Sequence, residues 1–256
     1  MNKRFGFGNN WKKYLKTMNL NRITDAENSL ISMLDLKTLK EQTFLDIGSG
    51  SGLFSLAAVN LGAKVTSFDY DMNSVDCNLA LKKKYLPKNT SWQIDHGSIL
   101  NVEFLKSLEK YDIVYSWGVL HHTGSMWKAI ENASSLVANN GLFYIAIYND
   151  QLIISIYWKL VKKLYNINFI LKYIIILIHF PYFILLRRII RAVTLRKLER
   201  GMNLWYDMLD WLGGYPFEVS KPSEIVKELE AKNFILKKQV LVGNRQGCNE
   251  FIFQKV

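Results

Sequence analysis

Short apolar segments alternate with amphipathic segments through most of the chain. The strand-like segments are residues 43–47, 64–68, 91–95, 111–117 and 142–148. The patterns between them are helical, and this alternation predicts an α/β fold, a parallel sheet with helices on both faces. Two further apolar segments, 233–242 and 248–253, are separated by residues 243–247, which are typical of a hairpin loop. We expect these two segments to close the sheet as antiparallel strands.

The first predicted strand runs into a glycine-rich turn that opens a helix. The turn contains Gly48, Gly50 and Gly52. Glycine tolerates positive φ and lacks the Cβ that would keep a ligand away from the backbone. The first turn of the following helix also leaves N–H donors unpaired. The turn therefore predicts a nucleoside site at the carboxyl ends of the strands, and a tight turn that packs only on itself is the alternative.

Two acidic residues accompany the glycine turn. Asp69 ends the second strand about 20 residues after the glycines, which is the usual spacing of an acid that binds a ribose. Asp46 lies two positions before Gly48, where it would repel a pyrophosphate and attract an ammonium group. An acid followed by three glycines at alternate positions, with a second acid ending the next strand, resembles the class I S-adenosylmethionine (SAM) dependent methyltransferases.

This resemblance continues along the chain. Residues 111–124 and 141–150 are similar to the fourth strand with its following loop, and to the fifth strand, of the ubiquinone-biosynthesis-like (quinol methylase-like) subgroup. The resemblance implies a Rossmann-like sheet with a helical insertion between the fifth and sixth strands. The expected parts are residues 1–150, an N-terminal cap and the SAM-binding core; residues 151–217, a basic apolar helical insertion or lid; and residues 218–256, which complete the core.

The resemblance implies SAM as the cofactor and S-adenosyl-L-homocysteine as its product. Asp46 is expected near the methionine ammonium and Asp69 on the ribose. Ser98 follows Gly97 where such families often place an acid for the adenine amino group. Aromatic residues near the N-terminus could cover the pocket or simply tie the terminus to the core. The expected cofactor-binding residues are Asp46, Gly48, Ser49, Gly50, Gly52, Asp69, Tyr70, Gly97, Ser98, Ile99, Ser116, Trp117 and Trp11.

Methyl transfer to a hydroxyl group requires a base. His121 and His122 follow the fourth strand at the ligand end of the sheet, and the ordinary pKa of histidine suits proton transfer near neutrality. A structural role for these histidines is the alternative. Tyr148 and Asn149, which end the fifth strand, are expected to orient the acceptor.

Residues 201–219 are dense in aromatic and acidic residues and suit either a pocket wall or a core anchor. Asp210 is a further catalytic candidate here, and Asp207 and Tyr215 are acceptor-binding candidates.

Residues 151–200 differ in character from the rest of the chain. They contain ten Lys or Arg and a single acid, Glu199, and so carry most of the net charge of +11. Positive charge confined to one segment argues against a general nucleic-acid surface. Apolar residues recur there at helical spacing opposite a polar face that includes Lys159, Lys162 and Lys163. The apolar positions are Ile153, Ile156, Tyr157, Leu160, Val161 and Leu164.

The following apolar run, residues 169–186, approaches the length of a membrane span, but Lys172, His179 and Pro181 interrupt it. We expect an interfacial hairpin or a lid, which would rest on a membrane, on a partner subunit or over the active site. The arginines that follow would bind lipid phosphates or an anionic acceptor; they are Arg187, Arg188 and Arg191. A buried helix pair with a solvated basic face is the alternative.

The sequence therefore predicts a SAM-dependent methyltransferase that acts on a small molecule, on an oxygen atom, in the cytoplasm or at the inner face of the membrane. The acceptor is lipophilic and quinol-like, or else phosphorylated, nucleotide-linked or a glycan precursor. An RNA methyltransferase and a non-catalytic SAM-binding protein are less favoured alternatives. Peripheral membrane contact and a homo-oligomer are both open. The two cysteines are isolated and predict neither a disulfide framework nor a metal site.

Overall fold

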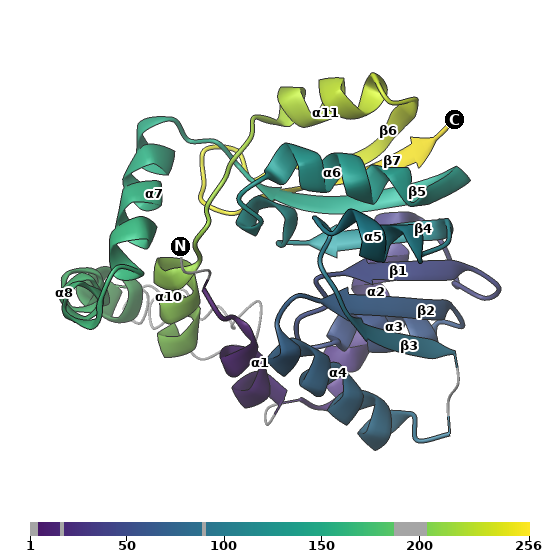
Figure 1. Ribbon diagram of the computed structural model, residues 1–256, viewed down its shortest axis with the longest axis horizontal. Coiled ribbons are helices and arrows are strands. Elements are labelled where there is room, and N and C mark those ends of the chain that lie inside the picture. Colours follow the sequence, from purple (N-terminus) through teal and green to yellow (C-terminus); the bar gives the residue numbers. More distant parts are fainter. Residues whose placement is uncertain (1–4, 16–17, 89–90, 187–203) are drawn as a thin grey trace.

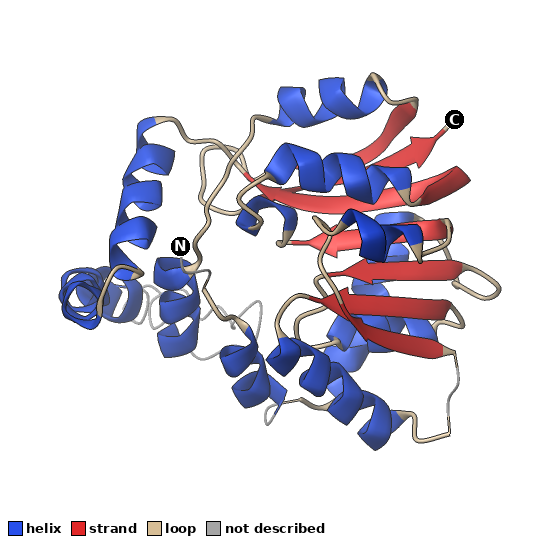
Figure 2. Cartoon of the chain, viewed as in Figure 1, coloured by secondary structure: helices blue, strands red, loops and turns tan. Residues whose placement is uncertain are grey.

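The computed structural model describes residues 5–15, 18–88, 91–186 and 204–256. Its centre is a seven-stranded sheet in the order β3-β2-β1-β4-β5-β7-β6 (Figures 1 and 2). Strands β1 to β5 pair in parallel, and β7 runs antiparallel to both of its neighbours. The strands are β1 (Thr43–Ile47), β2 (Lys64–Asp69), β3 (Trp92–His96), β4 (Tyr111–Trp117), β5 (Val137–Tyr148), β6 (Phe234–Val240) and β7 (Cys248–Lys255).

This architecture confirms the predicted fold class, including the antiparallel closure by the C-terminal strands. The predicted strand positions are correct to within a few residues. The exception is β5, which begins at Val137 rather than at residue 142 because Val137 already pairs with Tyr111 of β4.

Helices cover both faces of the sheet (Figure 2). One face carries α5 (Val102–Lys106), α6 (Met126–Ser135) and α11 (Pro222–Glu230), and the other carries α2 (Leu20–Leu34), α3 (Leu53–Asn60) and α4 (Met72–Tyr85). Side-chain caps begin two of these helices: Asn19 accepts from the Arg22 N–H at the start of α2, and Asp71 accepts from the Asn73 N–H at the start of α4.

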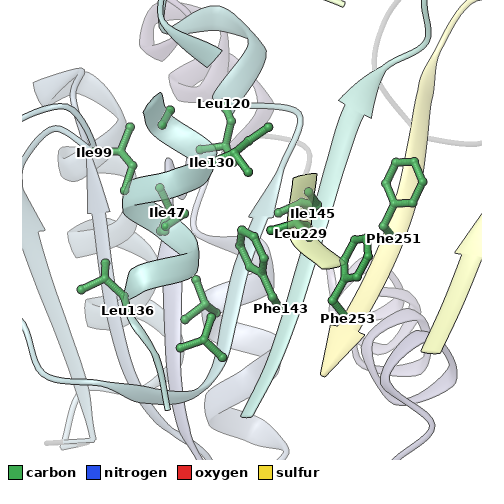
Figure 3. Close-up of a cluster of buried hydrophobic side chains, with 14 of the residues drawn as sticks. Ile47, Ile99, Leu120, Ile130, Leu136, Phe143, Ile145, Leu229, Phe251 and Phe253 are labelled. Carbon is green, nitrogen blue, oxygen red and sulfur yellow. The ribbon is translucent and has the colours of Figure 1, made fainter. Parts of the chain in front are cut away.

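The core beneath α6 and α11 is built from strand residues that point to one face. Figure 3 shows Phe143 of β5 beside Phe251 and Phe253 of β7, with Leu229 of α11 packed near them. The rings of Phe251 and Phe253 are stacked with their centres 6.0 Å apart. Because β7 contributes two large aromatic side chains to this core, the antiparallel closure of the sheet stabilises the whole domain.

A helical insertion lies between β5 and β6, as predicted. It comprises α7 (Ile153–Tyr165), α8 (Phe169–Phe180), the π-helical segment η2 (Pro181–Leu186) and α10 (Leu204–Gly213). The insertion has a small core of its own, which includes Trp158, Phe183, Met208 and Leu212. In Figure 1 it stands on the side of the sheet toward which β1, β4 and β5 run, so it faces the ligand end of the strands.

The predicted apolar positions of α7 do not form its buried side. Ile153 and Ile156 are exposed to solvent, while Lys162 of the supposed polar face is buried. The helix packs instead through Trp158 and Tyr165, together with Val161 of the predicted apolar face. The alternative of a buried helix pair with a solvated basic face is therefore wrong for the described part of the insertion.

The packing of β7 yields a stability prediction. Phe251→Ala should lower the free energy of unfolding by about 3–5 kcal/mol, because a fully buried aromatic side chain would leave a cavity. Ile235→Ala on the neighbouring β6, where the side chain is half exposed, should cost less than about 1 kcal/mol. Urea unfolding of both variants checks the difference, and equal losses would contradict it.

Candidate active site

The glycine turn between β1 and α3 passes between the tips of two neighbouring strands. The N–H groups of Gly48 and Ser49 donate to the Phe68 carbonyl at the end of β2, over 2.8 and 3.2 Å. A Cβ at position 48 would lie 2.4 Å from Val119, which follows β4, and φ at Gly48 is +73°. Backbone conformation and lack of space therefore both require glycine here. The turn lies where the tips of β1, β2 and β4 meet.

Asp69, at the end of β2, holds this turn through its side chain. One carboxylate oxygen accepts from the Gly50 N–H at 2.9 Å, and the other accepts from the Asp71 N–H at 2.8 Å. The carboxylate thereby joins the glycine turn to the loop after β2. The structure thus brings together Asp69 and the glycines, as their spacing along the chain predicted.

Asp46 lies inside β1 beneath the turn and is almost fully buried. The Ser55 hydroxyl of α3 donates to its carboxylate at 2.6 Å. Burial raises the pKa of Asp46 to about 7, repulsion from Asp69 acts in the same direction, and the bond from Ser55 opposes the rise. This carboxyl group is therefore poised to lose its proton if a cation binds nearby.

The expected adenine-binding residues lie in the loop after β3. The Ser98 hydroxyl accepts from the Leu100 N–H at 3.2 Å, so it supports its own turn. Ile99 is buried, and its carbonyl accepts from the Asn132 side chain at 2.8 Å. Gly97 is packed against the Phe104 ring, and Tyr70 of the loop after β2 is exposed.

At the end of β4, Ser116 is buried, whereas the backbone at Gly118 is uncovered. The Ser116 hydroxyl is fully buried and donates to the Ile47 carbonyl at 3.1 Å, so it ties β4 to β1. Trp117 is partly buried. At Gly118, where φ is +75°, no described atom other than those of Gly118 and its two chain neighbours lies within 4 Å of the place a Cβ would occupy. The backbone is therefore uncovered directly after β4, while the Ser116 side chain is turned toward the neighbouring strand.

The N-terminal helix α1 (Gly8–Leu15) lies over the glycine turn. The Trp11 indole lies 3.1 Å from the Cβ position of Gly50, and the Gly8 N–H donates to Asp71 at 2.9 Å. The Asn10 side-chain amide donates to the Asp210 carboxylate on α10. Segment 5–15 therefore connects the glycine turn to the insertion.

His121 and His122 lie in the short helix η1 (Leu120–His122) after β4 and are both buried. His121 stacks on Tyr148 with ring centres 3.9 Å apart, and its Nδ1 accepts from the Tyr148 N–H at 3.3 Å. The ring hydrogen therefore sits on Nε2, which has no partner among the described residues. Burial lowers the pKa of His121 well below its usual value, and repulsion from His122 and Lys162 adds to this. His121 is thus neutral, with its hydrogen on Nε2.

His122 has the opposite arrangement. Its Nδ1 donates to the Pro216 carbonyl at 2.6 Å, so the lone pair is on Nε2. The Phe7 ring lies 5.1 Å from the His122 ring, and the Cβ position of Gly214 lies 3.1 Å from it. His122 therefore stands between the N-terminal segment and the insertion, with the nitrogen that takes up protons held in a defined orientation.

Lys162 of α7 completes this cluster and is buried, although the sequence pattern places it on the predicted polar face of the helix. Its ammonium donates to the Trp211 carbonyl and lies 4.3 Å from the Trp211 ring centre and 4.9 Å from that of Phe217. Burial lowers the pKa of Lys162 to about 7, although attraction from Asp210 opposes the shift. Two aromatic residues four positions before and three after Lys162, Trp158 and Tyr165, were the available signal for its inward orientation.

The remaining expected residues fall in several places. The Asn149 amide donates to Gly243 at 2.8 Å and accepts from Asn249 at 3.0 Å, so it braces the C-terminal hairpin. The Tyr215 carbonyl accepts from the Phe5 N–H, which ties the N-terminal segment to the insertion. Four expected acceptor-binding side chains lie outside the described part of the structure: Asp207, Arg187, Arg188 and Arg191.

Comparison with known proteins agrees with this geometry. Residues 45–143 match the family described as "Methyltransferase domain". The magnesium protoporphyrin IX methyltransferase of Synechocystis PCC 6803, solved with bound SAH, superposes with a TM-score of 0.56 at 14% identity, over 93% of this chain and 89% of that one. The fold is therefore that of the class I SAM-dependent methyltransferases, and the chain carries a methyltransferase domain.

In sequence, the chain is similar to methyltransferases of two kinds. The ubiquinone biosynthesis O-methyltransferase of Pelagibacter ubique is 30% identical over 116 residues, 45% of this chain and 46% of that protein. The ribosomal protein L11 methyltransferase of Helicobacter hepaticus is 33% identical over 85 residues, 33% of this chain and 26% of that protein. The matched part of the chain is thus similar to ubiquinone biosynthesis O-methyltransferases, and the chain spans less than half of the length of these relatives. The matched family region ends before the helical insertion.

The burial of Asp46 predicts a pH dependence of stability. Between pH 3.8 and about 7 the Asp46 carboxyl is ionised in the unfolded chain but protonated in the fold. The unfolded state therefore binds fewer protons, and the free energy of unfolding should fall by on the order of 4 kcal/mol as the pH rises through this range. Urea unfolding of the protein without added ligand should show that Asp46→Asn removes this contribution. Asp25→Asn, on the exposed side of α2, should leave it in place.

Proposed function

We propose that this protein is a SAM-dependent methyltransferase that transfers a methyl group to an oxygen atom of a small-molecule acceptor. The observation that carries the proposal is the Asp69 carboxylate, bonded to the Gly50 N–H at the ligand end of the sheet. An acid at the end of β2 beside a glycine turn is the arrangement that binds the ribose of a nucleoside cofactor.

The residues around the turn fit a nucleoside that carries a positive charge. Asp69 would accept from the ribose hydroxyls, and the open position at Gly118 leaves room for the ligand beyond β4. The Asp46 carboxyl group beneath the turn, whose pKa is raised to about 7, would ionise when the methionine ammonium binds near it. Gly97, Ser98 and Ile99 would border the adenine, and Trp11 would cover the turn.

SAM supplies a methyl group on a positively charged sulfur, which is already activated for displacement. The protein has to align the acceptor oxygen and remove its proton. We assign the base to His122, because its Nε2 carries the lone pair. His121 would donate its Nε2 hydrogen to the acceptor, and Tyr148, stacked on His121, would hold that ring in place.

The acceptor is proposed to be lipophilic and quinol-like. Aromatic side chains surround the two histidines: Tyr148 lies 5.2 Å from Phe217 and 5.5 Å from Trp211, measured between ring centres. Such a wall suits a flat apolar molecule with one polar edge. A phosphorylated acceptor is the second candidate, since Lys162 is a cation in the same cluster.

Asp69→Ala should weaken SAM binding by at least about 30-fold, because the variant loses a charged hydrogen-bond acceptor inside the site. Isothermal titration calorimetry with SAM measures the loss. Asp25→Ala is the matched control, since it removes an exposed acid from α2. Asp69→Asn keeps the shape of the side chain and serves as a second variant in case Asp69→Ala does not fold. Unchanged SAM affinity in both Asp69 variants would contradict the ribose assignment.

His122→Gln should lower the rate of methyl transfer by about 100-fold or more while SAM affinity stays within about twofold, because only the proton acceptor is lost. The assay follows labelled methyl groups from SAM into a panel of quinol and phenol acceptors, and into sugar phosphates as the second panel. Product in the organic phase supports the lipophilic acceptor, and product confined to the sugar phosphates would refute it. If His122→Gln transferred methyl groups as fast as the wild type, His122 could not be the base.

A further inference from the structure

The outward face of α7 is apolar. Ile153 is 81% exposed, and Ile156, Tyr157 and Leu160 also lie open to solvent. These positions follow the helical spacing of three and four residues, so they form one continuous stripe. A stripe of this kind normally packs into a core, yet nothing in the described part of the chain covers it.

The outward face of α8 extends this apolar surface. Leu177 is 75% exposed, and the large apolar side chains around it are also open; they are Phe169, Ile170, Tyr173, Ile174 and Ile178. The Tyr157 hydroxyl donates to His179 Nε2 at 2.8 Å, and His179 Nδ1 donates to the Ile175 carbonyl, so the hydroxyl of the half-exposed Tyr157 joins α7 to the buried His179 of α8. Figure 1 shows α7 and α8 at the outer edge of the molecule, with α10 on their inner side. We call these exposed side chains of α7 and α8 the apolar outer face.

The positive charges on α7 and α8 indicate what kind of partner could bind there. Lys159, Lys163 and Lys172 are exposed on the same two helices, and the sequence contains no acid from residue 151 to residue 198. A second copy of the chain would bring two basic segments together, which like-charge repulsion opposes. An occupant that is both apolar and anionic fits instead, and the surface of an anionic lipid bilayer has both properties.

The geometry of the helices indicates how the bilayer would be engaged. No helix in the described ranges is long and apolar enough to cross a membrane. With 13 and 12 residues, α7 and α8 are each about 20 Å long, shorter than a bilayer core of about 30 Å. Helices with one apolar side, flanking lysines and interfacial tyrosines lie in the plane of the membrane surface.

We propose that the apolar outer face of α7 and α8 docks on the surface of an anionic lipid bilayer, with its lysines at the lipid phosphates. The inner side of α7 carries Lys162 and Trp158, which pack against Trp211. A cleft of about 510 Å³ between α6 and α7 is lined by Ile153, Ile156 and Lys159 of the outer side and by Phe217 of the aromatic cluster. Docking would therefore bring the mouth of this cleft to the lipid surface. The proposal does not require that the protein transfer methyl groups.

The test is flotation of the full chain with vesicles of phosphatidylcholine and phosphatidylglycerol, compared with vesicles of phosphatidylcholine alone. We expect the wild-type protein to float with the anionic vesicles. Ile156→Glu with Leu177→Glu, and separately Lys159→Glu with Lys163→Glu, should each reduce binding by about tenfold or more. The matched controls have the same changes elsewhere: Leu20→Glu with Leu79→Glu for the apolar pair, and Lys37→Glu with Lys83→Glu for the charge pair. All four are exposed on other parts of the surface.

Results of two kinds would overturn the proposal. The first is a wild-type protein that does not float, or face variants that float as well as the wild type. The second is a wild-type dimer, seen by light scattering, that the Ile156→Glu and Leu177→Glu changes convert to a monomer, since the face would then bind a second copy. Calorimetric SAM titration of every variant keeps this test separate from the proposed activity, because docking variants should bind SAM like the wild type.

Discussion

The candidate site depends on one stretch of backbone that has no room for side chains. The glycine turn must pass between the end of β2, where it donates to Phe68, and Val119 after β4. Its position is what places Asp69 against the Gly50 N–H and keeps Asp46 buried beneath the turn. A side chain at position 48 would separate these strand tips and would disturb the hydrogen bond between Asp69 and the Gly50 N–H.

Much of the fold follows from local patterns in the sequence. Strand positions, the parallel core, the closing hairpin and the helical insertion were all predicted, because alternating apolar segments and glycine turns act over short distances. The approach of Asp69 to the glycine turn was predicted as well, since parallel strands end at one edge of the sheet. The orientation of α7 was not. Periodicity identifies the residues that share a face of a helix, but it does not identify what lies opposite that face.

The same limit explains the individual side chains that the sequence did not locate. Lys162 lies on the predicted polar face of its helix, yet its side chain is buried against Trp211. Asn149 was expected to orient the methyl acceptor, yet its side chain supports the C-terminal hairpin. Each outcome depends on a partner about 50 to 100 residues away along the chain. The tautomers of His121 and His122 depend likewise on Tyr148 and Pro216. Partners so distant in sequence leave no periodic trace in it.

Each side of α7 carries side chains in an unfavourable environment: a buried lysine on the inner side and exposed isoleucines on the outer side. Burial of Lys162 on the inner side works against the stability of the fold, since its pKa falls to about 7 and its charge loses solvation. Exposure of Ile153 and Ile156 on the outer side leaves apolar surface in water. Rotating the helix about its axis would relieve both penalties, yet it would also withdraw Trp158 from Trp211. The observed orientation is therefore reasonable for a helix that has an aromatic cluster on one side and an apolar, anionic partner on the other.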